Sequence, residues 1–273
     1  MRIFDCFMYF DEDLLLEIRL ETLFNHVDQF IIVEANLDHA GNERKPQFDI
    51  EKFTKYKDKI KYILLKDLPR HNNFYKKNWG PAWRRENLQR NALSRGYESS
   101  EPDDLIMISD LDEIPNPDKI KNFSNNHKLG CFVQKNFLYK INLLNINEPK
   151  WYGTRISKKK YLKSPQWLRE IKITKRPFYK FYKPRFDIFI EDGGWHFSSM
   201  KTVENIFKKL NSYAEQQFNN EKFKNMSFIK KKLDSKEDLF ERGYKYETIR
   251  IDNTYPNFIF NNQDKLKEFI YNE

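Results

Sequence analysis

Cysteine and long apolar runs are scarce in this sequence. Cys6 and Cys131 are the two cysteines among 273 residues, and they lie too far apart to suggest a metal knuckle. Each lies in an apolar, strand-like run, so we expect two buried free thiols in a reducing compartment. No run reaches membrane-spanning length, and Asp5 interrupts the N-terminal residues where a signal peptide or anchor would stay apolar. These absences predict a cytoplasmic chain with no transmembrane segment.

Linker segments and internal repeats are also missing. No stretch is rich in Pro, Gly and Ser together, so we expect a single domain over residues 1–273. A charged fraction of 33% would by itself favour disorder, but 24 Phe, 15 Tyr and 5 Trp supply material for a hydrophobic core. The sequence therefore predicts a globular domain with a heavily charged surface.

Positive charge is present in excess. Lys and Arg outnumber Asp and Glu by 49 to 40, which gives a formal net charge of +9 and favours anionic partners such as nucleic acid, acidic membranes or phosphorylated small molecules. Much of the excess is scattered lysine, including residues 158–160 and 230–232, which we expect to lie on solvated faces. A nucleic-acid-binding module with stacking aromatics is an alternative function, but the best-organised stretch of the chain is acidic.

Residue periodicity predicts alternating strands and helices, and hence an α/β protein. A strand over 3–10, a helix from 13 to about 27 and a strand over 29–33 favour a parallel pair with a right-handed crossover. The elements expected after them are a lysine-rich helix, a strand at 62–65, a surface loop at 69–81, a helix at 83–93 closed by Gly96, strands at 131–143, 151–162 and 186–190, and mainly helical sequence from about 202.

The best-organised stretch is Asp103–Pro115. Its apolar run predicts a strand buried on both faces, which leads directly into Asp110, Asp112 and Glu113. In extended backbone the two aspartates would project to the same side. Two hard oxygen ligands at a sheet edge suit a divalent cation bound to phosphate. A pair of solvated turn acids is the alternative.

Two other functions fit this acidic motif less well. An EF-hand loop that starts at Asp110 would need Gly and Glu where the sequence has Pro115 and Lys121. A haloacid-dehalogenase-type phosphatase also places two aspartates after a strand, but it usually follows them with Thr or Val, where this chain has Ile114. The acidic motif therefore fits a metal and phosphate site better than an EF-hand loop or a phosphatase site.

A second group of candidate residues lies at Glu191–His196. Its two glycines permit close backbone approach, Glu191 and Asp192 are candidate proton acceptors, and His196 is a candidate metal ligand. The alternatives are a turn acid at Asp192 and a hydrogen-bonded core histidine. Together with the two aspartates of the earlier motif, a histidine ligand would suit Mn²⁺ better than Ca²⁺.

A third feature is the arginine-bearing helix expected at 83–93. Arg85 and Arg90 would bind a diphosphate through their guanidinium forks if this helix lies beside the acidic strand. Surface charge, paired with Glu86 within the helix, is the alternative. The sequence leaves both open.

Taken together, these stretches resemble glycosyltransferase family 17, whose best-known members add a bisecting β-1,4-linked N-acetylglucosamine to the core mannose of N-glycans. The sequence departs from the family pattern at Asn36–Gly41, and we expect it to lack the membrane anchor and stem of the Golgi members. We therefore expect the acceptor and the compartment to differ from theirs more than the chemistry. The matching blocks, in the family's order, are Phe4–Phe7, Asp13–Leu20, Val27–Ala35, Trp83–Glu86, Gln89–Asn91, Ile108–Pro115 and Gly193–Ser198.

The resemblance implies a GT-A-type fold: a Rossmann-like α/β sandwich with a mostly parallel central sheet and a helical C-terminal part. Residues 1–116 would form the nucleotide-sugar-binding half and residues 117–273 the acceptor-side half. The donor would be a nucleotide sugar, most closely UDP-GlcNAc, and the acceptor a glycan; nucleic acid is not expected as a partner. Mn²⁺ or Mg²⁺, held by Asp110, Asp112 and His196, would bridge the donor's diphosphate.

The resemblance also implies a general base. Family members look like inverting enzymes, in which a single in-line displacement needs one base on the acceptor hydroxyl. We expect Asp192 to be that base. Glu113 and Glu191 are the other candidates, and Glu113 is alternatively a brace of the metal site. A catalytically lapsed relative that only binds glycans is a further alternative, against which the intact aspartates and histidine argue.

The remaining expected roles concern substrate binding. Exposed aromatics such as Trp79, Trp151 and Tyr152 are candidates for stacking on acceptor sugars, but core packing is the favoured role for each. The expected donor-binding residues are Glu34, Arg85, Arg90 and Asp110.

Overall fold

The computed structural model describes residues 1–70, 80–174, 182–200, 204, 206–207, 225–239 and 241–271. The chain divides into two units, of which the first contains residues 1–133 and 152–193 and the second contains residues 134–151 and 194–273. Two strands, β6 (Leu129–Leu138) and β8 (Lys150–Lys158), cross the boundary between these ranges. Each unit therefore contains part of both strands.

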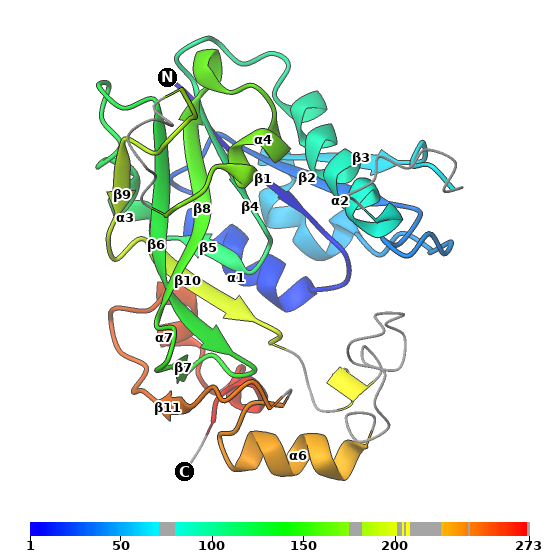
Figure 1. The fold of residues 1–273 in the computed structure, drawn as a ribbon, viewed down its shortest axis with the longest axis vertical. Helices are drawn as coiled ribbons and strands as arrows, with labels where there is room; N and C mark the ends of the chain where they lie inside the picture. The colour runs from blue at the N-terminus through cyan, green and yellow to red at the C-terminus, as the bar shows by residue number, and fades with distance from the viewer. Residues whose placement is uncertain are drawn as a thin grey trace. The chain divides into compact units, whose positions relative to one another are not determined.

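The first unit is built on parallel strands (Figure 1). β1 (Ile3–Met8) lies between β2 (Gln29–Ala35) and β4 (Leu105–Ser109), and β3 (Ile60–Leu65) completes the order β3-β2-β1-β4. All of these pairings are parallel. The helix between β1 and β2, α1 (Asp13–Leu23), supplies the crossover that a parallel pair requires. The predicted parallel strand–helix–strand unit is confirmed.

Apolar side chains bury these strands and the helix against one another. All of β4, and all but the end residues of β1, is buried, as expected for parallel strands covered on both faces. α1 buries Leu16, Leu20 and Leu23, which recur at helical spacing. The thiols of Cys6 and Cys131 are buried and unbridged, as predicted, and burial raises the pKa of Cys131 to about 12.

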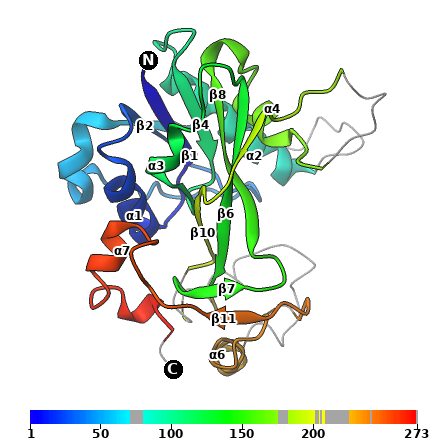
Figure 2. The ribbon, with the colours of Figure 1, turned by 90° about the vertical axis from the view of Figure 1, so that its left-hand side faces the viewer.

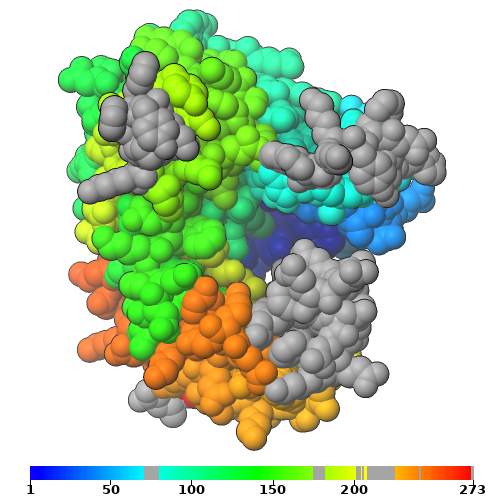
Figure 3. All heavy atoms as spheres, viewed as in Figure 1, coloured from blue at the N-terminus to red at the C-terminus, as the bar shows by residue number. Residues whose placement is uncertain are grey.

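Antiparallel and short elements complete the first unit as a mixed α/β structure with a mostly parallel sheet. β8 pairs antiparallel with β4 over Arg155–Lys158, and β6 pairs parallel with β9 (Ile188–Ile190). α2 (Pro81–Asn91), coloured cyan to teal, reaches the surface in Figure 3, and it buries Arg85, Gln89 and Arg90. The remaining elements are β5 (Glu113–Pro115), α3 (Pro117–Ile120), α4 (Pro165–Glu170) and 3₁₀ helices at Ile50–Lys59, Ala92–Gly96 and Lys159–Tyr161.

The second unit contains shorter strands and helices. β10 (Gly194–Ser198) pairs parallel with the end of β6. β7 (Leu143–Asn145) pairs antiparallel with β6 and with β11 (Tyr246–Thr248), which lies beside it in Figure 2. Helix α6 (Met226–Asp234) contributes Ile229 and Leu233 to a core that also contains Leu138 and Tyr246. The last described elements are α7 (Asn257–Asn261) and a 3₁₀ helix at Lys267–Phe269.

Several predictions of local structure are wrong. The strand predicted over 131–143 ends at Leu138, because Tyr139 has a φ of 66° and the chain turns before β7. α4 lies where no element was predicted. The lysine-rich helix predicted before β3 is present, in the form of a 3₁₀ helix. Lys158 is buried rather than on a solvated face, and its ammonium donates to the Asn125 carbonyl at 3.0 Å.

The described residues do not establish a helical C-terminal part. The helix expected from about 202 falls mainly on residues outside the described ranges, as do Trp79 and most of the loop expected at 69–81. Among the C-terminal residues that are described, α6 and α7 are short and β11 is a strand. Within the described ranges, no helix is both long enough and apolar enough to cross a membrane. The single domain and its division after residue 116 stay predictions.

Candidate functional site

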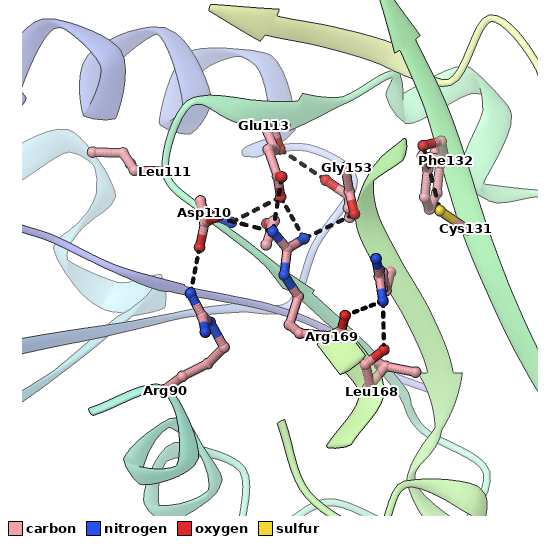
Figure 4. Close-up of polar contacts among 12 residues, drawn as sticks. Arg90, Asp110, Leu111, Glu113, Cys131, Phe132, Gly153, Leu168 and Arg169 are labelled. Atoms are coloured by element: carbon pink, nitrogen blue, oxygen red, sulfur yellow. Dashed lines mark hydrogen bonds and ion pairs between the residues drawn. The ribbon is translucent and has the colours of Figure 1, made fainter. Parts of the chain in front are cut away.

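The acidic motif forms a turn at the end of β4 (Figure 4). β4 ends at Ser109, and the Glu113 amide donates to the Asp110 carbonyl at 3.1 Å. Asp110 and Asp112 therefore lie on a turn and not on extended backbone, and the projection of their side chains to the same side stays a prediction. This Asp110–Glu113 turn nevertheless follows the carboxyl end of a parallel strand, which is where ligands bind in open α/β sheets.

The side chain of Glu113 folds back over the turn. It is fully buried, and its Oε2 accepts the Asp110 backbone amide at 2.9 Å. Arg169, on α4, donates to Oε2 at 2.7 Å and to Oε1 at 2.9 Å. Such bidentate arginine–carboxylate pairs are stronger and more directional than neutral hydrogen bonds. Glu113 is thus fixed by donors from its own turn and from α4.

Asp110 is held by two guanidinium groups. Arg169 Nη2 donates to its Oδ2 at 2.9 Å, and Arg90 Nη2, from α2, donates to its Oδ1 at 3.1 Å. Arg90 also pairs with Glu86 at 2.7 Å. The Asp110 side chain remains 38% exposed, whereas that of Glu113 is 1% exposed. Asp110 is therefore the point where the carboxylate–arginine cluster, formed by Arg90, Asp110, Glu113 and Arg169, meets solvent.

A buried arginine on α1 holds the backbone of the same turn. Arg19 forms a bidentate pair with Asp5 of β1 at 2.7 and 2.6 Å, and both side chains are fully buried. Its Nη1 donates to the carbonyls of Asp110, Leu111 and Glu113 at 3.2, 3.2 and 2.9 Å. The turn is consequently anchored to a helix and a neighbouring strand through one side chain.

Two further effects act on the arginines near the turn. Burial lowers the pKa of Arg169, but the charges of Glu113 and Asp110 outweigh burial and leave that pKa above its ordinary value. Burial, with the charge of Arg169, lowers the pKa of Arg155 to about 10. Both guanidinium groups are therefore charged at neutral pH.

Arg85 contacts two loops. Its Nε and Nη2 donate to the carbonyls of Pro69 and Arg70 at 2.9 and 3.2 Å, and its Nη1 donates to the His39 carbonyl at 2.9 Å. Gly41 packs against this guanidinium with a φ of +98°, and a Cβ there would lie 2.6 Å from Nη2. Arg85 therefore ties these loops to α2, and its donor-binding role stays a prediction.

Glu34, at the end of β2, is fully buried within the protein. Its Oε1 accepts from Arg44 at 2.8 Å and from the Gln47 amide at 2.7 Å. Its Oε2 accepts from the Phe48 amide at 3.0 Å and from the Tyr62 hydroxyl at 2.9 Å. These bonds pin the loop after β2 to the sheet. Nucleoside binding by Glu34 stays a prediction, and it would require one of the bonds to open.

The acids of the second group lie on an exposed turn between β9 and β10. Glu191 and Asp192 are both exposed, and Asp192 has a φ of 50°. Asn116 donates through its amide side chain to the Asp192 carbonyl at 3.3 Å and through its backbone to the Gly193 carbonyl at 2.8 Å. A Cβ at Gly193 would lie 2.6 Å from the Ile190 carbonyl oxygen, so the turn requires glycine. The fold thus ties this turn to the residue that follows β5.

His196 lies in the second unit. It is buried, its Nδ1 is 3.0 Å from the amide oxygen of Asn136, and its ring stacks on Trp151 with centroids 4.3 Å apart. This environment is that of a hydrogen-bonded core histidine, and its metal role stays a prediction. In the first unit, Tyr152 lies edge-on to Phe189 at 5.7 Å. Sugar stacking by Trp151 and Tyr152 likewise stays a prediction.

The first unit offers two carboxylates to a divalent cation. Asp110 and Asp112 are partly exposed on one turn, and Mg²⁺ commonly uses one or two protein carboxylates, with waters and substrate phosphates as its other ligands. Each carboxylate oxygen has two lone pairs, so Asp110 retains acceptor capacity beside its bonds to arginine. The donor chemistry fits the predicted ion. No group of three or more His, Cys, Asp and Glu forms a complete metal site in the described ranges, and the metal assignment stays a prediction.

Sequence reasoning missed Arg19 and Arg169 as parts of the site. A signal existed for Arg19, because it lies on the apolar face of α1 while Asp5 interrupts an apolar strand. Two opposite charges in buried positions are normally paired. No comparable signal marked Arg169, since the short helix that carries it has no clear periodicity.

Comparison with known proteins supports the assignment of these residues to one family. The chain matches the family model of glycosyltransferase family 17 over residues 1–249. The match includes the Asp110–Glu113 turn, α2 and the Glu191–His196 segment. None of the curated proteins compared matches the chain. The resemblance indicated by the ordered blocks is confirmed.

Proposed function

The chain belongs to glycosyltransferase family 17, and from this premise we propose that it is a metal-dependent, inverting transferase of N-acetylglucosamine. Family membership supports glycosyltransferase activity, with a nucleotide-sugar donor and an acceptor. The finer proposal is that UDP-GlcNAc is the donor, that a glycan hydroxyl is the acceptor and that the fold is of the GT-A type. The observation that carries it is the half-exposed Asp110 carboxylate at the end of β4, beside Arg90 and Arg169.

Asp110 and Asp112 would hold Mn²⁺ or Mg²⁺ at this turn. The ion would neutralise charge on the departing nucleoside diphosphate. The protein's own contribution is to fix the turn, through Arg19 from beneath and Arg169 from the side. Carboxylates held in place before substrate arrives cost little reorganisation in the transition state.

Arg90 is the better supported of the two arginines proposed for the diphosphate. It already contacts Asp110 at 3.1 Å, and its buried Nε has no hydrogen-bond partner. An unsatisfied buried donor costs about 1–3 kcal/mol, so a phosphate oxygen that reached it would be favoured. Arg85, by contrast, donates to three loop carbonyls.

Asp192 remains the proposed general base. Its carboxylate is on an exposed turn tied to Asn116, which leaves it accessible to an acceptor hydroxyl. Glu113 is less suited to that role because its oxygens accept from Arg169 and from the Asp110 amide. Its geometry favours the alternative role, as a brace of the metal site. Glu191 is the second candidate for the base.

A thermal-shift screen of nucleotide sugars, with and without Mn²⁺, tests the donor, the metal and the class of function together. Ligand binding to the folded state raises its stability by mass action, so UDP-GlcNAc should raise the melting temperature more in Mn²⁺ than in EDTA. A shift that is identical in EDTA would contradict the metal role. Salt-sensitive oligonucleotide binding without such a shift would favour the nucleic-acid alternative.

The base is tested by Asp192→Asn in a transfer assay with UDP-GlcNAc. Loss of a general base lowers turnover by about 10²–10⁴-fold, while affinity for the donor should persist. Loss of donor binding alone would contradict the assignment, and Glu191→Gln would then be the next variant to assay. Donor binding without any transfer in the wild type would favour the catalytically lapsed alternative.

A further inference from the structure

Beyond the metal carboxylates themselves, we infer that Arg169 is a positioning residue that fixes the direction of the Asp110 carboxylate. The inference rests on the proposed function, because it concerns how the proposed metal ligand is held. Arg169 was not among the candidate residues from sequence, and it enters the site through α4. Its role follows from the bonds that it makes, from its anchoring and from the partial exposure of the carboxylate that it holds.

Arg169 and Glu113 together hold Asp110 at both ends. Glu113 Oε2 accepts the Asp110 backbone amide at 2.9 Å, and Arg169 donates to the Asp110 side chain at 2.9 Å. Two further bonds, of 2.7 and 2.9 Å, join Arg169 to Glu113. The four bonds form a closed ring. In it, the Arg169–Glu113 ion pair fixes both the backbone amide and the carboxylate of Asp110. A partly exposed aspartate would otherwise sample several rotamers.

The planar guanidinium is required for this bridge. Arg169 reaches both carboxylates with Nη2 and Glu113 also with Nη1, whereas a lysine ammonium is a single flexible point charge. Nη1 also donates to the Gly153 carbonyl of β8 at 2.9 Å. The arginine is thus held in one plane between a strand and the turn.

A second arginine anchors the helix that carries Arg169. Arg155 of β8 donates from Nη1 to the carbonyls of Leu168 and Ile171, each at 2.9 Å, and to the carbonyl of Arg169 itself. These are acceptors at the C-terminal end of α4, which lacks helical partners for its last carbonyls. A positive charge at this end is also favoured by the helix dipole. Arg155 therefore fixes the backbone from which Arg169 extends.

Asp110 has acceptor capacity beyond its bonds to arginine. Its side chain is 38% exposed, and each carboxylate oxygen can accept at two lone pairs. Arg169 therefore orients this carboxylate while part of it stays exposed to solvent, where a cation would bind.

Mn²⁺ binding in the presence of UDP, followed by calorimetry, tests the inference. The main variants are Arg169→Lys, which keeps the charge but removes the fork, and Glu113→Gln, which keeps the shape of the partner. Residues that orient metal ligands typically change metal affinity by about 10–100-fold when replaced. We expect the dissociation constant of Mn²⁺ to rise by that factor in both variants, while UDP affinity in EDTA stays at the wild-type value.

The matched control is Arg242→Lys in the second unit. Arg242 also forms a fork with a buried carboxylate, that of Asp238, at 2.8 and 3.0 Å, but it has no proposed role in the site. Its replacement should lower the melting temperature without changing either affinity. Equal loss of Mn²⁺ and UDP binding in Arg169→Lys and Glu113→Gln would indicate general damage and overturn the positioning role.

Three outcomes are distinguishable. Selective loss of Mn²⁺ affinity in a folded Arg169→Lys protein, or in Glu113→Gln if the lysine variant does not fold, supports the inference. Wild-type Mn²⁺ affinity in a folded Arg169→Lys protein overturns it and leaves the proposed function standing. Absence of UDP-dependent Mn²⁺ binding in the wild-type protein overturns the metal assignment and the positioning role with it. Because Glu113→Gln keeps the shape of the side chain and leaves Asp110 as a counter-charge for Arg169, it supplies the test if the lysine variant does not fold.

Discussion

Each unit of the chain contains an arginine that grips a buried carboxylate, but the two arrangements differ in what else they hold. In the first unit, Arg169 joins buried Glu113 to Asp110, which is 38% exposed. In the second, Arg242 forms a fork with Asp238, whose carboxylate also accepts from the Arg242 backbone amide and from the hydroxyls of Tyr139 and Tyr246. We refer to this second set as the Asp238 cluster.

We interpret the difference as that between a structural ion pair and an ion pair of the proposed site. The Asp238 carboxylate is 2% exposed and accepts from the Arg242 side chain, from the Arg242 backbone and from tyrosine hydroxyls. The carboxylate–arginine cluster leads through Arg169 to a carboxylate that solvent reaches. Buried pairs contribute little net stability by themselves, so an ion pair that ends at an accessible acid is the better candidate for a site.

Breaking the fully buried Arg19–Asp5 pair of the first unit should have the largest effect on the stability of the protein. Arg19→Met would leave Asp5 charged and unpaired in the interior, at a cost of about 3–5 kcal/mol. It would also release three carbonyls of the Asp110–Glu113 turn. We expect a loss of that size in the free energy of unfolding measured with urea. A smaller loss, comparable to that of a surface pair, would contradict the structural role of Arg19.

Removing the accessible carboxylate should affect activity rather than stability. Asp110→Ala should lower the rate of sugar transfer by about 10²–10³-fold, the size typical of a lost electrostatic contact in a transition state. The control is Asp67→Ala, since Asp67 is an exposed acid in the same unit that pairs with Arg95 at 2.9 Å. The proposed distinction between the carboxylate–arginine cluster and the Asp238 cluster would be contradicted by either of two results. One is a wild-type rate of sugar transfer in Asp110→Ala, and the other is a wild-type rate that EDTA does not change.

A change in the Asp238 cluster should affect stability rather than activity. Asp238→Asn removes the charge that Arg242 and two tyrosines face, and losses from buried hydrogen bonds are about 1–3 kcal/mol. We expect a lower midpoint of urea unfolding together with an unchanged transfer rate per folded molecule. A large loss of turnover without loss of stability would show that the second cluster also serves the reaction.

Raising the pH above 10 should give the smallest of these effects, a change in the free energy of unfolding that involves Tyr139 in the second unit and Arg155 in the first. Burial, with the charge of Asp238, raises the pKa of Tyr139 to about 12, so its stabilising contribution is complete below pH 10 and is lost as pH rises toward 12. Arg155 has the opposite sign, because its pKa is lowered to about 10 and the folded state loses that proton first.

The measurement is the pH dependence of unfolding between pH 10 and 12 for the wild type and Tyr139→Phe. One pKa unit corresponds to about 1.4 kcal/mol, and we expect the variant to lose about 1–2 kcal/mol less stability than the wild type over this interval. If the free energy of unfolding fell equally with pH in the two proteins, the raised pKa of Tyr139 would be contradicted.

The order of the early elements was predictable because their signals are local. β1, α1 and β2 follow apolar periodicity within short windows, and the structure pairs the two strands in parallel as expected. The strand before Asp110 was also found, since a run of branched apolar residues bounded by acids has few other interpretations. That the arginine-bearing helix lies beside this strand is supported by the contact between Arg90 and Asp110.

The partners of the candidate residues were not predictable in the same way. Arg169 and Asp110 are 59 residues apart, and Arg19 and Glu113 are 94 apart. Periodicity carries no information at such separations. The buried contacts of Glu34, with Arg44, Gln47, Phe48 and Tyr62, similarly depend on how the loop after β2 folds back.

The sequence by itself determined the family, the parallel strands and the place of the acidic turn, because each depends on residues that are close together or on an ordered set of short blocks. Only the tertiary structure decided which partners the carboxylates have and how far solvent reaches them. Desolvation makes a buried charge costly unless a partner is present, so packing assigns Glu113 to Arg169 and leaves Asp110 as the acid that solvent reaches.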